Sequence, residues 1–337
     1  MRIAIRGLGA TGSHIARQLL RPPVSELILH DCDVRRQEQV LSAIKASVDD
    51  SVSVAGHVGQ TLFAGHRPPG VLVLAGPAGT HIGPATEALK QGTSVVSVSD
   101  DATEVRQLLE LGPVAEESGL SIVVSAGFSP GLSCLLARYA GDSLDVVESI
   151  SIYTAGTGGP SCARQHHRAL KRAALEWRDG AWQKRRGGSG RDLVWFPDPF
   201  GARDCYMAEL ASPLLMQAVY PDAARLSARM SANRRDRATF RLPMLRPPHK
   251  DGGPGAIRVE VSGRIGRSVE TVILGTMDHP SVAGATVAAV TTLKVGAQLA
   301  PLGASGLASW SNVGLVLAEL NQRGVRAARF TGTTVTA

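Results

Sequence analysis

The sequence predicts an α/β protein with a doubly wound parallel sheet, followed by a second α+β domain built on a mostly antiparallel sheet. Three observations predict this fold class. A spaced set of glycines follows the first apolar run, short apolar runs then alternate with helical patterns, and longer runs of alternating apolar and polar residues begin after residue 145. Helices between short apolar strands are typical of parallel βαβ units, whereas alternating runs joined by tight turns are typical of antiparallel hairpins.

The chain opens with RIAIRGLGATGSHIARQLL, an apolar strand that runs through a G-x-G-x-x-G pattern into a helix. In this pattern Gly7 permits a tight turn, Gly9 lets the backbone approach a pyrophosphate, and Gly12 lets helix and strand pack closely. Amide groups at the helix N-terminus then face the phosphate. The stretch is a Rossmann-type fingerprint, and we expect Ala10 and Thr11 to contact a dinucleotide together with the three glycines.

The second apolar run, ELILHDCD, ends in Asp31, 19 residues after Gly12. A carboxylate at this place accepts hydrogen bonds from the adenosine ribose and repels a 2′-phosphate, which favours NAD as the cofactor. Arg35 and Arg36 follow closely and could hold such a phosphate, so NADP stays possible. For the glycine pattern as a whole, the alternative is a tight turn that binds no ligand.

Three further strands with helical patterns after them are VLVLAGPAG, SVVSVSDD and LSIVVSAG. Ligands bind outside the carboxyl ends of the strands in such sheets, so these strand ends should meet at one crevice. We therefore expect cofactor contacts at the ends of the first two of them: Ala75, Gly76, Pro77 and Ser99.

The last of these strands ends in the turn GFSPG at residues 127–131. With the glycine fingerprint, the AGP strand end and the SVVSVS segment, this turn resembles the saccharopine dehydrogenase-like oxidoreductases, a family that includes lysine 6-dehydrogenase and saccharopine reductase. The resemblance covers residues 1 to about 155 and is looser beyond. It implies that the G-x-x-P-G turn passes the nicotinamide, so that Phe128 and Ser129 line that end of the cofactor. The alternative is that the turn only begins the next helix, with Ser129 as its N-cap.

The same resemblance implies an NAD(P)-dependent oxidoreductase that acts on the C–N bond of an amino acid or its imine. Two alternatives stay open. One is a two-domain Rossmann dehydrogenase that acts on an alcohol or aldehyde, which a Lys or His base on the substrate domain would identify. The other is a non-catalytic nucleotide-sensing protein.

Beyond residue 145, VVESISIYTAG predicts a strand and AIRVEVSGRIGRSVETVILG predicts a two-stranded hairpin. From Pro280 an apolar helix, poor in charge, should bury against the first sheet or a partner subunit. We expect a dinucleotide-binding domain over 1–145, a substrate and oligomerisation domain over 146–278, and C-terminal helices over 279–337 that return to the first domain. The protein should be a homo-oligomer, such as a homodimer.

Catalytic candidates lie in the segment PSCARQHHRALKRAALEW, which predicts a helix over 160–177 with Ser161 as its cap. Arg164 lies near its N-terminus and could bind a substrate carboxylate in bidentate fashion. His166 falls on the apolar face with Cys162, either as a core residue or as a substrate contact. Asp100, at a strand end, could hold a substrate ammonium, with capping of the next helix as the alternative.

Composition limits the other classes of function. The 337 residues are 44% hydrophobic, enough for two domains. The four cysteines include no C-x-x-C pair, and no H-E-x-x-H is present, so we expect neither a metal site nor disulfides, and a reducing, cytoplasmic location. No run reaches 18 apolar residues, so no membrane span is expected. The net charge of +7 concentrates in residues 164–191, which indicates a solvated face or a carboxylate site rather than nucleic acid, because aromatics make up only 4%.

Overall fold

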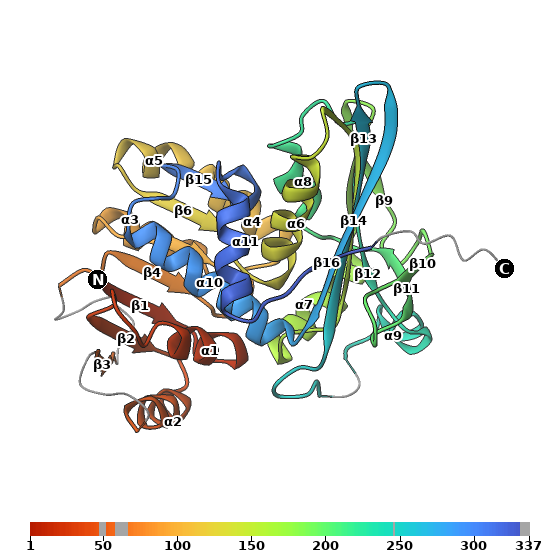
Figure 1. Ribbon diagram of the computed structural model, residues 1–337. Helices are drawn as coiled ribbons and strands as arrows, with labels where there is room; N and C mark the ends of the chain where they lie inside the picture. The colour runs from red at the N-terminus through yellow and green to blue at the C-terminus, as the bar shows by residue number, and fades with distance from the viewer. Residues whose placement is uncertain (47–51, 58–66, 245–246, 331–337) are drawn as a thin grey trace.

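The computed structural model describes residues 1–46, 52–57, 67–244 and 247–330. Figure 1 shows two sheets beside each other: a twisted sheet wrapped by helices at the N-terminal end of the chain, and a tall sheet of long strands next to it. The predicted fold class, a Rossmann-type parallel sheet with a second, mostly antiparallel sheet, is confirmed. No helix in the described part of the chain has the length and hydrophobicity that crossing a membrane requires.

The first sheet has seven strands in the order β15-β6-β5-β4-β1-β2-β3, and all neighbouring strands are parallel. Its first six strands in chain order have the arrangement 3-2-1-4-5-6, so the order reverses between β1 and β4, where ligands of such sheets bind. The strands are β1 (Arg2–Arg6), β2 (Glu26–His30), β3 (Ser53–Gly56), β4 (Val71–Leu74), β5 (Ser94–Ser97), β6 (Ser121–Val124) and β15 (Gly303–Gly306).

Helices cover both faces of this sheet because its strands are apolar on both sides. Ile3 and Ile5 of β1 pack in one cluster with residues of α1 and α10, whereas Ala4 packs in the other with residues of α3 and α4. The helices around the sheet are α1 (Ala10–Gln18), α2 (Val34–Lys45), α3 (Ile82–Lys90), α4 (Ala102–Glu110), α5 (Gly112–Glu117), α10 (Pro280–Gly296) and α11 (Val313–Gln322).

The long apolar helix that the sequence predicts from Pro280 is α10, and it is buried by other elements of the same chain. Thirteen of its 17 residues are buried, and it packs against α1, β4 and β5 within the same chain. The expected burial against the first sheet is therefore confirmed, and no partner subunit is needed for it. The domain boundaries at residues 145 and 278 stay a prediction.

The second sheet is mixed, and its only parallel pair among the described strands is β7 with β12. The predicted hairpin is confirmed as β13 paired with β14. Helices α6 (Ser133–Gly141) and α8 (Ser212–Gln217) pack against it, on the side of the first sheet (Figure 1). The strands of this sheet are β7 (Val146–Ala155), β8 (Ala174–Arg178), β9 (Ala181–Arg185), β10 (Asp192–Trp195), β11 (Ala202–Met207), β12 (Arg225–Ser231), β13 (Gly255–Ile265), β14 (Ser268–Asp278) and β16 (Ala328–Arg329). Between them in the chain lie the helices α7 (Pro160–Lys171) and α9 (Arg234–Thr239).

The predicted helix over 160–177 was too long, and its predicted cap was wrong. Helix α7 ends at Lys171, and its N-cap is Gly159 with Pro160 as the first helical residue. The following segment is strand β8, in which Glu176 is 1% exposed and accepts hydrogen bonds from Arg185 (2.9 Å) and Arg225 (2.7 Å). These arginines come from β9 and β12, so contacts distant in sequence override the local helical pattern.

Ser129 is likewise not the N-cap of a helix. Residues Phe128–Leu132 form a wide π-helical turn in which Ser129 is extended, and α6 begins only at Ser133. The hydroxyl groups of Ser129 and Ser133 lie 3.0 Å apart. The turn is pressed against α10, where a side chain at Gly284 would come within 2.9 Å of the Phe128 amide nitrogen. An added Cβ on Gly131 would come within 2.6 Å of the Ser125 carbonyl oxygen, so close packing explains this glycine of the turn.

Candidate functional site

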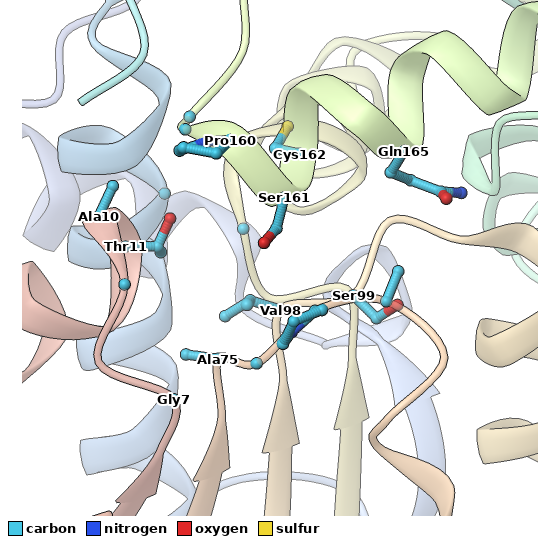
Figure 2. Close-up of a pocket in the computed structure, with 18 of the residues that line it drawn as sticks. Gly7, Ala10, Thr11, Ala75, Val98, Ser99, Pro160, Ser161, Cys162 and Gln165 are labelled. Atoms are coloured by element: carbon cyan, nitrogen blue, oxygen red, sulfur yellow. The ribbon is translucent and has the colours of Figure 1, made fainter. Parts of the chain in front are cut away.

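A cavity of about 830 Å³ lies at the carboxyl edge of the parallel sheet, between that edge and α7. In Figure 2 the strand-end residues Ala75 and Ser99 lie across the cavity from Ser161 and Cys162 on α7. Of the residues that the sequence analysis nominated, all but Gly12 and Arg35 line this cavity, and Gly12 packs behind it. The lining nominees are Gly7, Gly9, Ala10, Thr11, Asp31, Ala75, Gly76, Pro77, Ser99, Asp100, Phe128, Ser129, Arg164 and His166.

The three glycines of the fingerprint have different physical roles. Gly7 has a φ of +98°, and an added Cβ there would collide with the backbone of Gly76. A Cβ on Gly12 would overlap the carbonyl oxygen of Gly7, so close packing requires glycine at both positions. Around Gly9, in contrast, no atom of the described residues lies within 4 Å of an added Cβ. The space beside Gly9 is therefore free for a ligand at the N-terminus of α1, where amide groups lack intrahelical acceptors.

Asp31 connects the glycine loop to the end of β2. Its side chain accepts hydrogen bonds from the amides of Leu8 (2.6 Å) and Asp33 (2.9 Å), and Arg36 lies 3.5 Å from it. The residue is only 6% exposed. Because a carboxylate has about four lone-pair sites, Asp31 retains capacity for a further donor on the cavity side. Asp31 thus has a structural role that the sequence analysis did not anticipate.

His81 orders the ends of β4 and β5. Its imidazole lies 2.8 Å from the Ser97 hydroxyl and 3.1 Å from the Gly76 carbonyl oxygen. Glu104 accepts hydrogen bonds from the His81 amide (2.7 Å) and the Ser99 hydroxyl (2.6 Å). Burial lowers the pKa of His81, although Glu104 opposes the effect. A neutral histidine therefore fixes the strand ends that face the cavity.

A cluster of three polar side chains, Asp100, Cys162 and His166, lies at the α7 side of the cavity. Their facing atoms are 3.2 Å apart for His166 Nε2 and Asp100 Oδ2, and 3.7 Å apart for Cys162 Sγ and each of the other two. Burial lowers the pKa of His166, but Cys162 and Asp100 outweigh it and raise that pKa well above 6.5. His166 therefore belongs to the cavity rather than to the core. Cys162 was missed as a site residue, although its four-residue spacing from His166 was visible in the sequence.

The neighbouring Asp101 connects the start of α4 to α7, beside the cluster. It is the N-cap of α4, accepting from the Thr103 and Glu104 amides at 3.0 Å. It also accepts from Gln165 of α7 (2.7 Å) and from Arg172 (3.1 Å), which directly follows α7. Burial raises the pKa of Asp101, but the Glu104 amide and Gln165 outweigh this effect and the net change is downward. The two adjacent aspartates therefore have different roles: Asp101 caps α4, whereas Asp100 faces the cavity.

Arg164 is exposed, lines the cavity, and makes no ion pair within the described ranges. Three other arginines of the basic segment bind carboxylates within the chain. Arg185 binds the buried Glu176, Arg191 binds Asp204 at 2.9 Å, and Arg172 binds Asp101. Arg164 therefore remains available for an anion near the cavity.

Taken with the strand order, which reverses between β1 and β4, this cavity lies where ligands bind in doubly wound parallel sheets. No protein-family model matches the sequence. Among solved structures, apo saccharopine dehydrogenase (L-Glu forming) from Saccharomyces cerevisiae matches with a TM-score of 0.72 and 13% identity, over 98% of this chain and 100% of that one. The expected resemblance to saccharopine dehydrogenase-like oxidoreductases is therefore confirmed for the fold.

Two further solved structures have the same fold at lower similarity. The DAP dehydrogenase of C. glutamicum, in complex with DAP, has a TM-score of 0.52 and 16% identity over 96% of this chain and 99% of that one. An engineered D-amino acid dehydrogenase bound to NADP+ has a TM-score of 0.51 and 17% identity, with the same coverage. At these identities the similarity establishes the fold alone.

Proposed function

We propose that the protein is an NAD(P)-dependent oxidoreductase that acts on the C–N bond of an amino acid or its imine. The observation that carries the proposal is one cavity that has a phosphate-accessible glycine loop at one end and the cluster of Asp100, Cys162 and His166 at the other. Support also comes from the fold, since the solved structures that share it include a saccharopine dehydrogenase, a DAP dehydrogenase and a D-amino acid dehydrogenase bound to NADP+.

The cavity fits a dinucleotide because Gly7 and Gly12 are needed for packing, whereas the space beside Gly9 is open to a ligand. Gly9 and the first amides of α1, at Ala10 and Thr11, would hold the pyrophosphate, and Asp31 would accept hydrogen bonds from the adenosine ribose. NAD is the favoured cofactor because Arg36, the candidate for a 2′-phosphate, lies against Asp31 and Asp33. The nicotinamide half would lie along the remaining nominees: Ala75, Gly76, Pro77, Ser99, Phe128 and Ser129.

When bound, the cofactor supplies the hydride acceptor or donor at its nicotinamide ring. The protein then has to orient the substrate carbon and to bind the groups attached to it. Arg164 would hold the substrate carboxylate, because a guanidinium matches a carboxylate in shape and charge. The cluster of Asp100, Cys162 and His166 would contact the nitrogen on the reacting carbon.

A second candidate function is the oxidation of an alcohol or the reduction of a carbonyl group. The specific observation in its favour is His166, a histidine on the second domain that lines the cavity beside a carboxylate. Such a histidine is the feature expected of an alcohol or aldehyde dehydrogenase of this architecture.

The direct test is to titrate the purified protein with NADH and NADPH and then to assay hydride transfer spectrophotometrically. A panel of amino acids, 2-keto acids with ammonia, alcohols and aldehydes separates the candidates. Turnover with an amino acid or imine supports the proposal, and turnover with alcohols alone supports the second candidate. Cofactor binding without turnover on any of them would leave a nucleotide-sensing protein. Homodimer formation and a cytoplasmic location stay predictions; light scattering tests the former.

A further inference from the structure

We propose that Asp100, Cys162 and His166 form a binding site for a zinc ion, with one coordination position open to the cavity. They are the one group of three metal-ligating side chains with converging ligand atoms in the described part of the chain, and these atoms all lie within 4.8 Å of one another. The sequence analysis expected no metal, because it searched for C-x-x-C and H-E-x-x-H spacings. The carboxylate comes from the loop between β5 and α4, 62 residues before Cys162.

The distances within the cluster match tetrahedral zinc coordination. Bond lengths of about 2.3 Å to sulfur, 2.0–2.1 Å to nitrogen and 2.0–2.2 Å to oxygen, at tetrahedral angles, separate sulfur from nitrogen or oxygen by about 3.6 Å and nitrogen from oxygen by about 3.4 Å. The observed separations are 3.7 Å for Cys162 Sγ to each partner and 3.2 Å for His166 Nε2 to Asp100 Oδ2. Each observed separation agrees with these values within about 0.2 Å.

The chemistry of the ligands also fits zinc. Thiolate, imidazole and carboxylate are its three common protein ligands, and three protein ligands with an open fourth position distinguish reactive zinc sites from closed structural ones. Asp100, Cys162 and His166 all line the cavity. The open position therefore faces the cavity and is accessible to water or to an oxygen or nitrogen atom of a ligand.

The surrounding contacts place the ligands before any metal arrives. Cys162 and His166 are one turn apart on α7, so their side chains share a face. Asp100 is held opposite them because the next residue, Asp101, is bound to Gln165 of α7 and to Arg172, which directly follows that helix. Gln165 is 2% exposed and Asp101 is 8% exposed. These contacts hold the loop that carries Asp100 against α7.

The role of the ion in a reaction rests on the proposed function, whereas metal binding does not. Next to a nicotinamide, zinc would bind a substrate oxygen or an uncharged nitrogen and stabilise negative charge on it. A substrate oxygen is the better partner when the substrate is an alcohol or carbonyl compound. Occupancy by zinc would therefore favour the second candidate function over one that requires a substrate ammonium near Asp100.

Cobalt substitution of the tag-free, full-length protein tests the site. The protein is treated with a chelator, reduced, and titrated with CoCl2 without NAD(P), while its absorption spectrum is recorded. We expect one Co2+ per chain, with an intense near-ultraviolet charge-transfer band from the Cys162 thiolate and the visible bands of tetrahedral cobalt. Zn2+ should displace the cobalt and abolish both.

Matched variants assign the signal. Cys162→Ser should lose the charge-transfer band, whereas Cys32→Ser, which removes the exposed thiol, should retain it. His166→Gln should weaken cobalt binding by more than the 10–100-fold typical of losing an outer contact, whereas His167→Gln, one residue along α7, should not. Circular dichroism checks that each variant is folded.

The site is refuted if the wild-type protein shows no charge-transfer band, or if the band persists unchanged in Cys162→Ser. Either result would leave the cluster as a hydrogen-bonded group without a metal. NADH titration of the same samples separates this outcome from the proposed function. Cobalt binding without NADH binding would reject the oxidoreductase and keep the metal site, and the reverse would do the opposite.

Discussion

Gly9→Val should abolish dinucleotide binding while it leaves the protein folded. Gly9 has a φ of −69° and an extended ψ of −163°, a conformation open to valine. No atom of the described residues lies within 4 Å of the added Cβ. Because valine is a poorer N-cap residue than glycine, the expected cost in folding free energy is about 1 kcal/mol.

The effect on binding should be much larger than the effect on folding. Valine would occupy the space through which a pyrophosphate reaches the amides of α1. A hydrogen bond to a charged group contributes about 1.5–3 kcal/mol, so losing two of them costs about 3–6 kcal/mol. At about 1.4 kcal/mol for each factor of ten, the Kd for NADH should rise at least about a hundredfold.

Isothermal titration calorimetry with NADH measures this change, and thermal unfolding of the same samples measures folding. Gly83→Val is the matched control: Gly83 also has no described atom within 4 Å of an added Cβ, and it does not line the cavity. The control should bind NADH as the wild type does. An unchanged Kd in a folded Gly9→Val protein would refute the placement of the pyrophosphate at α1.

Three further predictions follow from the packing and charges of the site. Gly12→Ala should destabilise the fold by about 1–3 kcal/mol or more, because its methyl group overlaps the Gly7 carbonyl, and a lower melting temperature would show it. Arg164→Ala should raise KM for a carboxylate substrate about tenfold to a hundredfold, whereas Arg186→Ala should not; steady-state kinetics that show the reverse would move the anion site. Asp101→Ala should cost about 0.5–2 kcal/mol at neutral pH through its lost cap. The lowered pKa of Asp101 means that the charge-dependent part of its stabilisation is fully present above pH 3.8 and is lost as the pH falls through the folded-state pKa, so denaturant melts of the two proteins should converge in acid.

The sequence by itself determined the elements whose signals are local. The glycine spacing after β1, the strand ends at β4 and β5, and the β13–β14 hairpin could all be identified, because turn residues and apolar periodicity act over a few residues. The same local signals nominated many of the residues that line the cavity, whereas Phe128 and Ser129 were nominated through the resemblance to a known family. They also suggested a helix where β8 lies, since they contain no information about the arginines that pair with Glu176.

Only the tertiary structure decided which polar side chains meet. Asp100 and Asp101 are adjacent in sequence and chemically alike, yet one caps α4 and the other faces α7, a division that depends on Gln165 and Arg172. The approach of Asp100 to Cys162, across 62 residues, follows from how the second domain folds over the first sheet. Contacts of this kind arise from the packing of whole elements, and no short window of sequence records them.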